Sequence, residues 1–326
     1  MKCSRFSIQK GLVSVVFSIF LFVGLNVSAF AGMKFLTIGT GDVGGTFYPV
    51  GSTISKIIND NVDGVKANVE STGGSVDNSR MVGQGKLQLG MAMGSVAYSA
   101  KTGIGKFKDT KFPELRVLFA TYPSISQWIA LEKTPVNSIY DLKGTTIAVG
   151  MAGSGSEVVS KMTLNAAGIT YEDITPKFLG VAEGAAAVRD GQADVAHAIG
   201  GIPFGGYLNL SETKTTKLIP VDEAIVAKIR EDKPYYYQAK VPAKSYKGQE
   251  EDVQSIGVKC VFIASTDLSD ELAYEIVKSV WSNMDVMHSG HKATQHMTED
   301  FVARDLPFEL HPGARKFWKE QGLTDQ

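Results

Sequence analysis

Phe35-Leu-Thr-Ile-Gly-Thr-Gly-Asp-Val-Gly-Gly-Thr46 is a short apolar segment that runs directly into a turn rich in glycine. Beyond the turn, Val50, Ile54, Ile57 and Ile58 recur at the spacing of one helical face. The stretch therefore predicts a strand, a loop and a helix in succession. This is the repeating unit of a parallel sheet, so an α/β fold is expected for the chain.

Similar units recur along the chain in two series. In each unit a run of apolar or β-branched residues ends at glycine or serine, and a helical pattern follows. The segment Lys233–Gln249 has no clear period and is predicted as a loop, in which Tyr235 to Tyr237 form either a recognition stripe or a packed surface. The further predicted strands are Val65–Glu70, Leu87–Met93, Thr145–Gly150, Pro176–Leu179 and Asp194–Ile199.

Two segments from the two series resemble each other directly, Gly85–Gly94 and Gly191–Gly200. Glycine, alanine and aliphatic residues fall at the same offsets in both. We therefore expect two similar α/β lobes, with a helix from Ser269 onward packed on the first lobe. The predicted limits are a signal peptide at 1–31, a first lobe at 32–122 and 258–326, and a second lobe at 123–257.

The N-terminus has the pattern of a secretory signal. A basic segment with Lys2, Arg5 and Lys10 precedes an apolar run, which ends at Ala29-Phe-Ala31. Small residues at these two positions favour cleavage after Ala31 over retention as a membrane anchor. No later stretch approaches the ~20 apolar residues that span a bilayer. The sequence thus predicts a soluble protein in the periplasm.

Charge and cysteine content limit the possible partners. The formal net charge is −1 and no basic cluster is present, so we expect no nucleic-acid partner. Removal of the signal would take Cys3 away and leave Cys260 alone, without a disulfide partner. Cys260 lies in an apolar, strand-like run, and His197 lies in another. Both are predicted to be buried in the core.

The ends of the predicted strands carry glycine, serine and threonine, and little charge. In open α/β sheets, ligands lie beyond these carboxyl ends, where free N–H groups of helix N-termini bind anions. Any single loop of this kind is equally explained as an ordinary turn with a helix cap. The five loops are Gly44–Tyr48, Thr72–Ser75, Gly94–Ser95, Gly153–Ser156 and Gly200–Gly201.

Enzyme alternatives have weaker support. Gly39, Gly41 and Gly44 formally match a dinucleotide-binding loop. Export disfavours that interpretation, because nicotinamide cofactors are not maintained outside the cytoplasm, and Pro49 crowds the first helical turn. The histidines between residues 288 and 296 lack the His-Glu-x-x-His arrangement, and no Gly-x-Ser-x-Gly elbow is present. We expect no catalytic residues, cofactor or metal.

Longer motifs resemble a known family. Thr37–Gly51, Glu70–Asn78 and Val149–Glu157 are similar to segments of TAXI-type solute receptors, the TRAP-associated extracytoplasmic immunogenic proteins that serve TRAP transporters. The resemblance implies a type II-like periplasmic binding protein, monomeric, with two α/β lobes, a hinge and a cleft between them. It also implies delivery of the ligand to integral-membrane TRAP subunits, with uptake driven by an ion gradient.

The resemblance further implies a small carboxylate or amino-acid ligand, such as glutamate, glutamine or a related dicarboxylate. No arginine lies in a glycine-rich loop, although Arg80 follows one. The absence of arginine from these loops favours recognition of the ligand by backbone and hydroxyl groups. The alternative is an exported receptor or interaction protein of the same fold without a transport partner. The motifs assign ligand contacts to Thr46, Tyr48, Thr72, Gly73, Ser75, Ser95, Ser154, Ser156, Gly201 and Phe204.

Overall fold

A ten-stranded mixed sheet runs through the part of the chain that the computed structural model describes, residues 33–324. The predicted signal peptide lies outside these residues. The strands follow the order β2-β1-β3-β10-β4-β7-β5-β6, with β8 paired to β4 and β9 to β10. Their bounds are β1 Lys34–Gly39, β2 Val65–Glu70, β3 Leu89–Met93, β4 Leu115–Leu131, β5 Thr146–Ala148, β6 Thr175–Lys177, β7 Val195–Gly200, β8 Thr216–Ile219, β9 Tyr237–Val241 and β10 Val253–Ser265.

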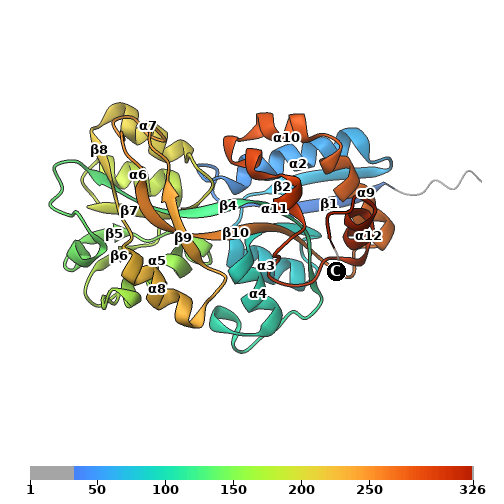
Figure 1. Cartoon of the computed structure of the whole chain (residues 1–326), viewed down its shortest axis with the longest axis horizontal. Helices are drawn as coiled ribbons and strands as arrows, with labels where there is room; N and C mark the ends of the chain where they lie inside the picture. The colour runs from blue at the N-terminus through green and yellow to red at the C-terminus, as the bar shows by residue number, and fades with distance from the viewer. Residues whose placement is uncertain (1–32, 325–326) are drawn as a thin grey trace, which may run out of the picture. The chain divides into compact units, whose positions relative to one another are not determined.

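Two long antiparallel strands, β4 and β10, join the two halves of this sheet (Figure 1). The segment Cys260–Ala264 of β10 pairs with β3, whereas Ile125–Ala130 of β4 pairs with β7. Each long strand therefore belongs to one half of the sheet at one of its ends and to the other half of the sheet at its other end. We call the part around β1, β2 and β3 the first lobe and the part around β5, β6 and β7 the second lobe.

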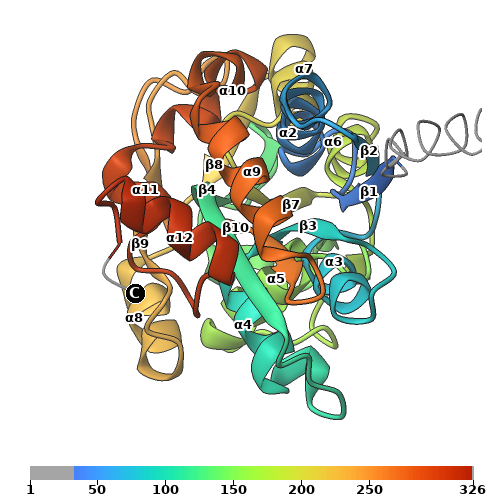
Figure 2. The same ribbon diagram turned by 90° about the vertical axis from the view of Figure 1, so that its right-hand side faces the viewer.

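Helices pack around both lobes (Figures 1 and 2). The first lobe carries α2 Phe47–Asn61, α3 Ser75–Gly83, α4 Gly94–Thr102, α9 Asp270–Trp281, α10 Met284–Gly290, α11 Glu299–Val302, α12 Pro312–Glu320 and the short 3-10 helices η1 Gly105–Phe107 and η3 Lys292–His296. The second lobe carries α5 Gly155–Ala166, α6 Val181–Arg189, α7 Gly205–Thr213, α8 Glu223–Asp232 and the 3-10 helix η2 Ile139–Leu142. Within residues 33–324, no helix has the length and apolar character required to cross a membrane.

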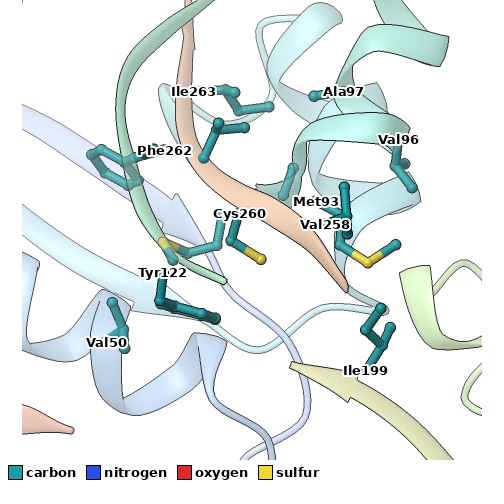
Figure 3. Packing of buried hydrophobic residues seen from close by; sticks show 14 of the residues in the cluster. Val50, Met93, Val96, Ala97, Tyr122, Ile199, Val258, Cys260, Phe262 and Ile263 are labelled. Atoms are coloured by element: carbon teal, nitrogen blue, oxygen red, sulfur yellow. The ribbon is translucent and has the colours of Figure 1, made fainter. Parts of the chain in front are cut away.

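The apolar patterns of the sequence mark the core correctly. Val50, Ile54, Ile57 and Ile58 are all buried on one face of α2. Cys260 is fully buried in β10 near Tyr122, as Figure 3 shows. Burial raises the pKa of its thiol to about 12. The prediction of a buried, structural cysteine is confirmed.

The predicted strands match the observed ones to within a few residues, and the two-lobed α/β fold is as expected. The prediction of a loop throughout Lys233–Gln249 is wrong, because Tyr237–Val241 forms β9 and pairs with Val253–Gly257 of β10. Most of β9 is half-buried, so its sequence shows no clean alternation, and Pro234 and Pro242 flank it. The residue limits of the two lobes stay a prediction.

Candidate functional site

A small cavity lies between the loops of the two lobes, close to the point where β4 leaves the first lobe. Its volume is about 70 Å³. A single water needs at least about 10–15 Å³ on this scale, so the cavity has room for a small group. Of the ten predicted contact residues, six line it: Thr46, Gly73, Ser75, Ser154, Ser156 and Phe204.

Four helices begin at the wall of this candidate site. Their first residues, Phe47 of α2, Ser75 of α3, Gly155 of α5 and Val181 of α6, all line the cavity. The N-terminal N–H groups of a helix lack partners within that helix, and the helix dipole adds partial positive charge there. The first pair of helices belongs to the first lobe and the second pair to the second. The site therefore favours an anionic group held from both sides.

Three serine hydroxyls of the site are held in the same way. Each oxygen accepts a hydrogen bond from a backbone N–H, so the position of the oxygen is set while its own hydrogen remains available. A serine hydroxyl has one hydrogen to donate, and none of these three donates to another group among the described residues. The pairs are Ser75 with Met93 at 3.0 Å, Ser154 with Glu157 at 3.0 Å and Ser156 with Ile199 at 3.2 Å.

Charged side chains contribute little to the wall. Among the described residues, no lysine or arginine lines the cavity, and Asp42 is the one acid that does. The Asp42 carboxylate accepts a hydrogen bond from the backbone N–H of Ala182 at 3.3 Å, across the lobes. The guanidinium of Arg80 lies over the ring of Phe107, 5.3 Å from its centroid. An anion here would meet hydroxyl and backbone donors, not a basic side chain.

His197 closes one side of the site. It is buried, lines the cavity and stacks on Trp128 with ring centroids 4.2 Å apart. Its Nε2 lies 2.8 Å from the hydroxyl of Ser126 and its Nδ1 2.6 Å from that of Ser160. Burial lowers the pKa of His197 to about 3, so the ring is neutral at physiological pH. The prediction of a buried core histidine is confirmed, with the addition that it faces the candidate site.

Glycine is required at Gly150, in the loop that leads into α5. Gly150 has φ +98, and a Cβ atom there would lie 2.6 Å from the Cβ of Ser156. Such a contact and such a φ both exclude other side chains. Gly74 also requires glycine because of its φ of +104, although a Cβ atom there would lie 3.7 Å or more from Ser154 in the second lobe. The two loops that carry Ser75 and Ser156 therefore depend on glycine for their shape.

The lobes touch each other around the candidate site. A hydroxyl, two backbone N–H groups and an ion pair bridge the gap between them. The bridges are Thr46 to the carbonyl of Gly201 at 2.9 Å, Val76 and Asp77 to the carbonyl of Gly153 at 3.1 and 3.3 Å, and Lys106 to Glu157 at 2.9 Å. The structure thus represents the arrangement in which the cleft is closed.

Four predicted contact residues lie outside the cavity wall. The Thr72 hydroxyl serves its own loop, where it bonds to Asn78 at 2.6 Å. Gly201 offers its carbonyl to Thr46, and Tyr48 lies partly exposed on α2 beyond the wall. Ser95 faces a separate cavity, where its hydroxyl lies 3.0 Å from that of Tyr236.

Several further residues line the site. Asp42, Met93 and Tyr122 belong to the wall and are not among the predicted contact residues, although Asp42 lies in the glycine-rich turn Gly39–Thr46. Tyr122 lies at the predicted boundary of the first lobe, so its position near the cleft could have been inferred. Its ring is fully buried, 6.5 Å from that of Phe47.

The comparisons with known proteins agree with the fold. A model of the NMT1-like family matches residues 38–322. PhnD1 from Prochlorococcus marinus in complex with methylphosphonate has a similar structure, with a TM-score of 0.54 and 14% identity over 90% of this chain and 100% of that chain.

Two further structures are less similar. The alkanesulfonate-binding protein SsuA from Xanthomonas axonopodis pv. citri bound to MOPS has a TM-score of 0.49 and 16% identity, over 80% of this chain and 74% of that chain. The substrate binding protein of an amino acid ABC transporter has a TM-score of 0.44 and 15% identity, over 79% of this chain and 100% of that chain.

The prediction of a TAXI-type receptor of a TRAP transporter is wrong. The family that matches almost the whole described chain, over residues 38–322, is the NMT1-like family. The physical reason lies in the motifs. Glycine, serine and threonine at strand ends satisfy the geometry of βα loops, so they report the fold and not the class of transporter.

Proposed function

Because the chain belongs to the NMT1-like family, we propose that it is an exported solute receptor. In this proposal the protein captures a small acid between its lobes and delivers it to a membrane transporter. The periplasm is its proposed location, as the signal pattern at 1–31 suggests. Its proposed role is binding, without chemical change of the ligand.

One observation supports the ligand class most directly. Ser75 from the first lobe and Ser154 and Ser156 from the second each keep a hydroxyl hydrogen free beside the same cavity. Hydroxyl and backbone donors bind a carboxylate or another oxyanion without a basic side chain. Since the cavity is small, a compact acid fits best. Glutamate, glutamine and related dicarboxylates are the first ligands to test, with methylphosphonate, the ligand of PhnD1, beside them.

The same arrangement supports a mechanism of closure. A ligand that accepts hydrogen bonds from both lobes binds the closed arrangement better than an open one, and this difference in affinity drives closure. The transporter would then recognise the closed form. An ABC transporter is the class to test, as it is the kind of transporter that the amino-acid substrate binding protein compared above belongs to.

Calorimetry on the mature protein tests the ligand and the site together. We first screen the acids above by their effect on the melting temperature, where a hundredfold excess over Kd stabilises the fold by about 2.7 kcal/mol. With the acid that binds, we expect Ser75→Ala and Ser156→Ala each to lose about 10- to 150-fold in affinity, because a hydrogen bond to a charged group is worth about 1.5–3 kcal/mol.

Ser279→Ala is the matched control. The Ser279 hydroxyl is buried in α9 and donates to the carbonyl of Ile276, away from the cavity. Its replacement should leave the affinity unchanged. If no acid in the panel raises the melting temperature, the ligand class is refuted. If the alanine substitution lowers the affinity in only one of the two lobes, the ligand does not bridge the lobes.

Uptake measurements test the transporter class. Cells that carry the gene should accumulate the identified ligand and cells without it should not. For an ABC transporter, depletion of ATP abolishes this uptake, and collapse of the ion gradients leaves it intact while ATP is maintained. The reverse pattern would contradict the ABC assignment without affecting the binding site.

A further inference from the structure

A much larger cavity separates the helices of the two lobes on one side of the sheet. It has a volume of about 740 Å³, within the range of about 300–1,000 Å³ that is typical of small-molecule sites. Its walls come from α4 and η1 of the first lobe and from α5 and α8 of the second. We propose that this groove is a second ligand site, which takes an amphipathic anion with an apolar body and one acidic group. The inference goes beyond the proposed function, which concerns the small cavity.

The floor of the groove is apolar. Val96, Phe107 and Ile229 are buried side chains that line it. The hydroxyls of Ser95 and Tyr236 also lie there and bond to each other at 3.0 Å, so that one of them donates its hydrogen to the other. A ligand body that enters the groove would gain free energy by removing apolar surface from water. The two hydroxyl groups of the floor would keep the hydrogen bond between them.

The rim of the groove is basic. The lining residues include four lysines, Lys106, Lys161, Lys228 and Lys233. They also include two exposed acids, Glu231 and Asp232. Three of these lysines have protein partners. Lys106 pairs with Glu157 at 2.9 Å, Lys228 donates to the carbonyl of Ala166 at 3.0 Å, and Lys161 lies over the ring of Tyr171.

Lys233 is different, because its ammonium group has no partner among the described residues. Its side chain is half-buried at the end of α8, beside the apolar floor. An ammonium group that has no carboxylate partner is available to pair with an anion. The combination of an apolar floor and this lysine at its edge indicates the orientation of the ligand, with the acidic group at Lys233 and the body on the floor.

The groove is separate from the candidate site in the closed arrangement. Val76 lines the groove and the preceding Ser75 lines the candidate site. Between them, the N–H groups of Val76 and Asp77 bond to the carbonyl of Gly153, so the start of α3 is held against the second lobe. The two ligands would therefore not compete for the same groups.

Binding of 8-anilinonaphthalene-1-sulfonate to the mature protein tests the proposal. This probe has an aromatic body and one sulfonate, and its fluorescence rises in apolar surroundings. We expect saturable binding of one probe to one protein. Its neutral analogue, N-phenyl-1-naphthylamine, lacks the sulfonate and should bind about tenfold more weakly.

Two substitutions locate the probe. Lys233→Gln should weaken binding of the sulfonate about tenfold and leave the neutral analogue unchanged. Met162→Trp places a larger ring in the groove and should abolish binding of both. Lys86→Gln, a change at an exposed lysine outside the groove, is the control and should alter neither. The melting temperature of each variant shows whether it remains folded, since unfolded protein also binds the probe.

The outcomes also separate this proposal from the first one. Ser156→Ala should not change the affinity for the probe, even though it lowers the affinity for a small acid. Absence of saturable binding, or equal binding by the wild type, Lys233→Gln and Met162→Trp, would overturn the second site. If the small acid displaced the probe, the probe would be bound in the candidate site, and this result would also overturn the proposal.

Discussion

The hydroxyl of Thr46 donates a hydrogen bond to the backbone carbonyl of Gly201 at 2.9 Å, and so ties the start of α2 in the first lobe to the end of β7 in the second. Thr46 is almost fully buried. The two residues lie 155 positions apart in the sequence, so the bond exists only when the lobes are in contact. It is therefore a specific reporter of closure.

Replacing Thr46 by valine should weaken the closed arrangement. The change keeps the shape of the side chain but leaves the Gly201 carbonyl without its partner, at a cost of about 1–3 kcal/mol. Since the ligand is proposed to bind the closed form, affinity for it should fall about 5- to 150-fold. Calorimetric titration measures the loss, and small-angle scattering shows whether the free protein is more open.

Thr53→Val is the matched control for that change. The Thr53 hydroxyl donates to the carbonyl of Pro49 within α2, so its bond does not cross between lobes. This variant should bind ligand like the wild type. Equal affinities of the Thr46 and Thr53 variants would show that the bond to Gly201 has no part in closure.

Replacing Ser154 by alanine should affect stability and binding together. Ser154 is the N-cap of α5, and its hydroxyl accepts from the N–H of Glu157. Loss of such a cap costs about 0.5–2 kcal/mol, so the melting temperature of the ligand-free protein should fall. Because the same hydroxyl borders the candidate site, affinity should fall as well.

Ser269→Ala separates the two effects. Ser269 caps α9 in the same manner, by accepting from the N–H of Leu272, and lies outside the cavity wall. This variant should lose stability and keep its affinity. If Ser154→Ala also lost stability but kept its affinity for the ligand, Ser154 would act only as a helix cap and not as a ligand contact.

His197 should make the protein less stable in acid. Its pKa is about 3 in the folded chain because of burial, and its ordinary value is 6.5. Between these pH values the unfolded chain binds a proton that the folded chain does not. The free energy of unfolding should therefore fall as the pH drops from 6.5 towards 3, by up to about 1.4 kcal/mol per pH unit from this group.

Denaturant unfolding of His197→Gln over the same pH range measures that contribution. The variant should be less stable near neutral pH, because the contacts to Ser126 and Ser160 are disturbed. The free energy of unfolding of the variant should also depend less steeply on pH. A slope equal to that of the wild type would show that the acid sensitivity comes from other groups, among them His291, His296 and His311, whose pKa values are also lowered by burial.

Cys260 should be unreactive in the native protein. Burial raises the pKa of its thiol to about 12, and the thiolate is the reactive form. Iodoacetamide should therefore modify the peptide that contains Cys260 only after unfolding in guanidinium chloride, as mass spectrometry of the digested protein would show. Equal modification before and after unfolding would contradict this prediction.

Export should remove residues 1–31. The prediction rests on Ala29 and Ala31, which lie outside the described residues. N-terminal sequencing of the protein from the periplasmic fraction should begin at Gly32. A mature chain that begins at Met1 would contradict the proposed export.

Much of the fold could be predicted because local patterns and tertiary packing agree. The segments from Gly85 and from Gly191 are recognisably equivalent in sequence, and both glycines have φ +71 at the turn that precedes β3 or β7. In contrast, β9 could not be predicted. Its half-buried residues carry no alternating pattern, and the strand owes its existence to pairing with Gln254 and Ile256 of β10, which lies later in the chain.

The site was predictable only at the level of loops. Ser75 and Ser95 both follow strands of the first lobe, yet one borders the small cavity and the other the large groove. The sequence identifies the loop but not the direction of each side chain within it. Asp42 could not be predicted for a related reason, because its role depends on Ala182, which is 140 residues away.

The position of β10 has a consequence for the folding of the chain during its synthesis. This strand lies between β3 and β4 in the middle of the sheet, although it comes from residues 253–265, near the end of the chain. Until these residues have been synthesised, β3 and β4 have no strand between them, so the two halves of the sheet cannot be joined. The sheet can therefore be completed only after residue 265 has been synthesised, and this strand order would delay the folding of a chain that is exported as proposed.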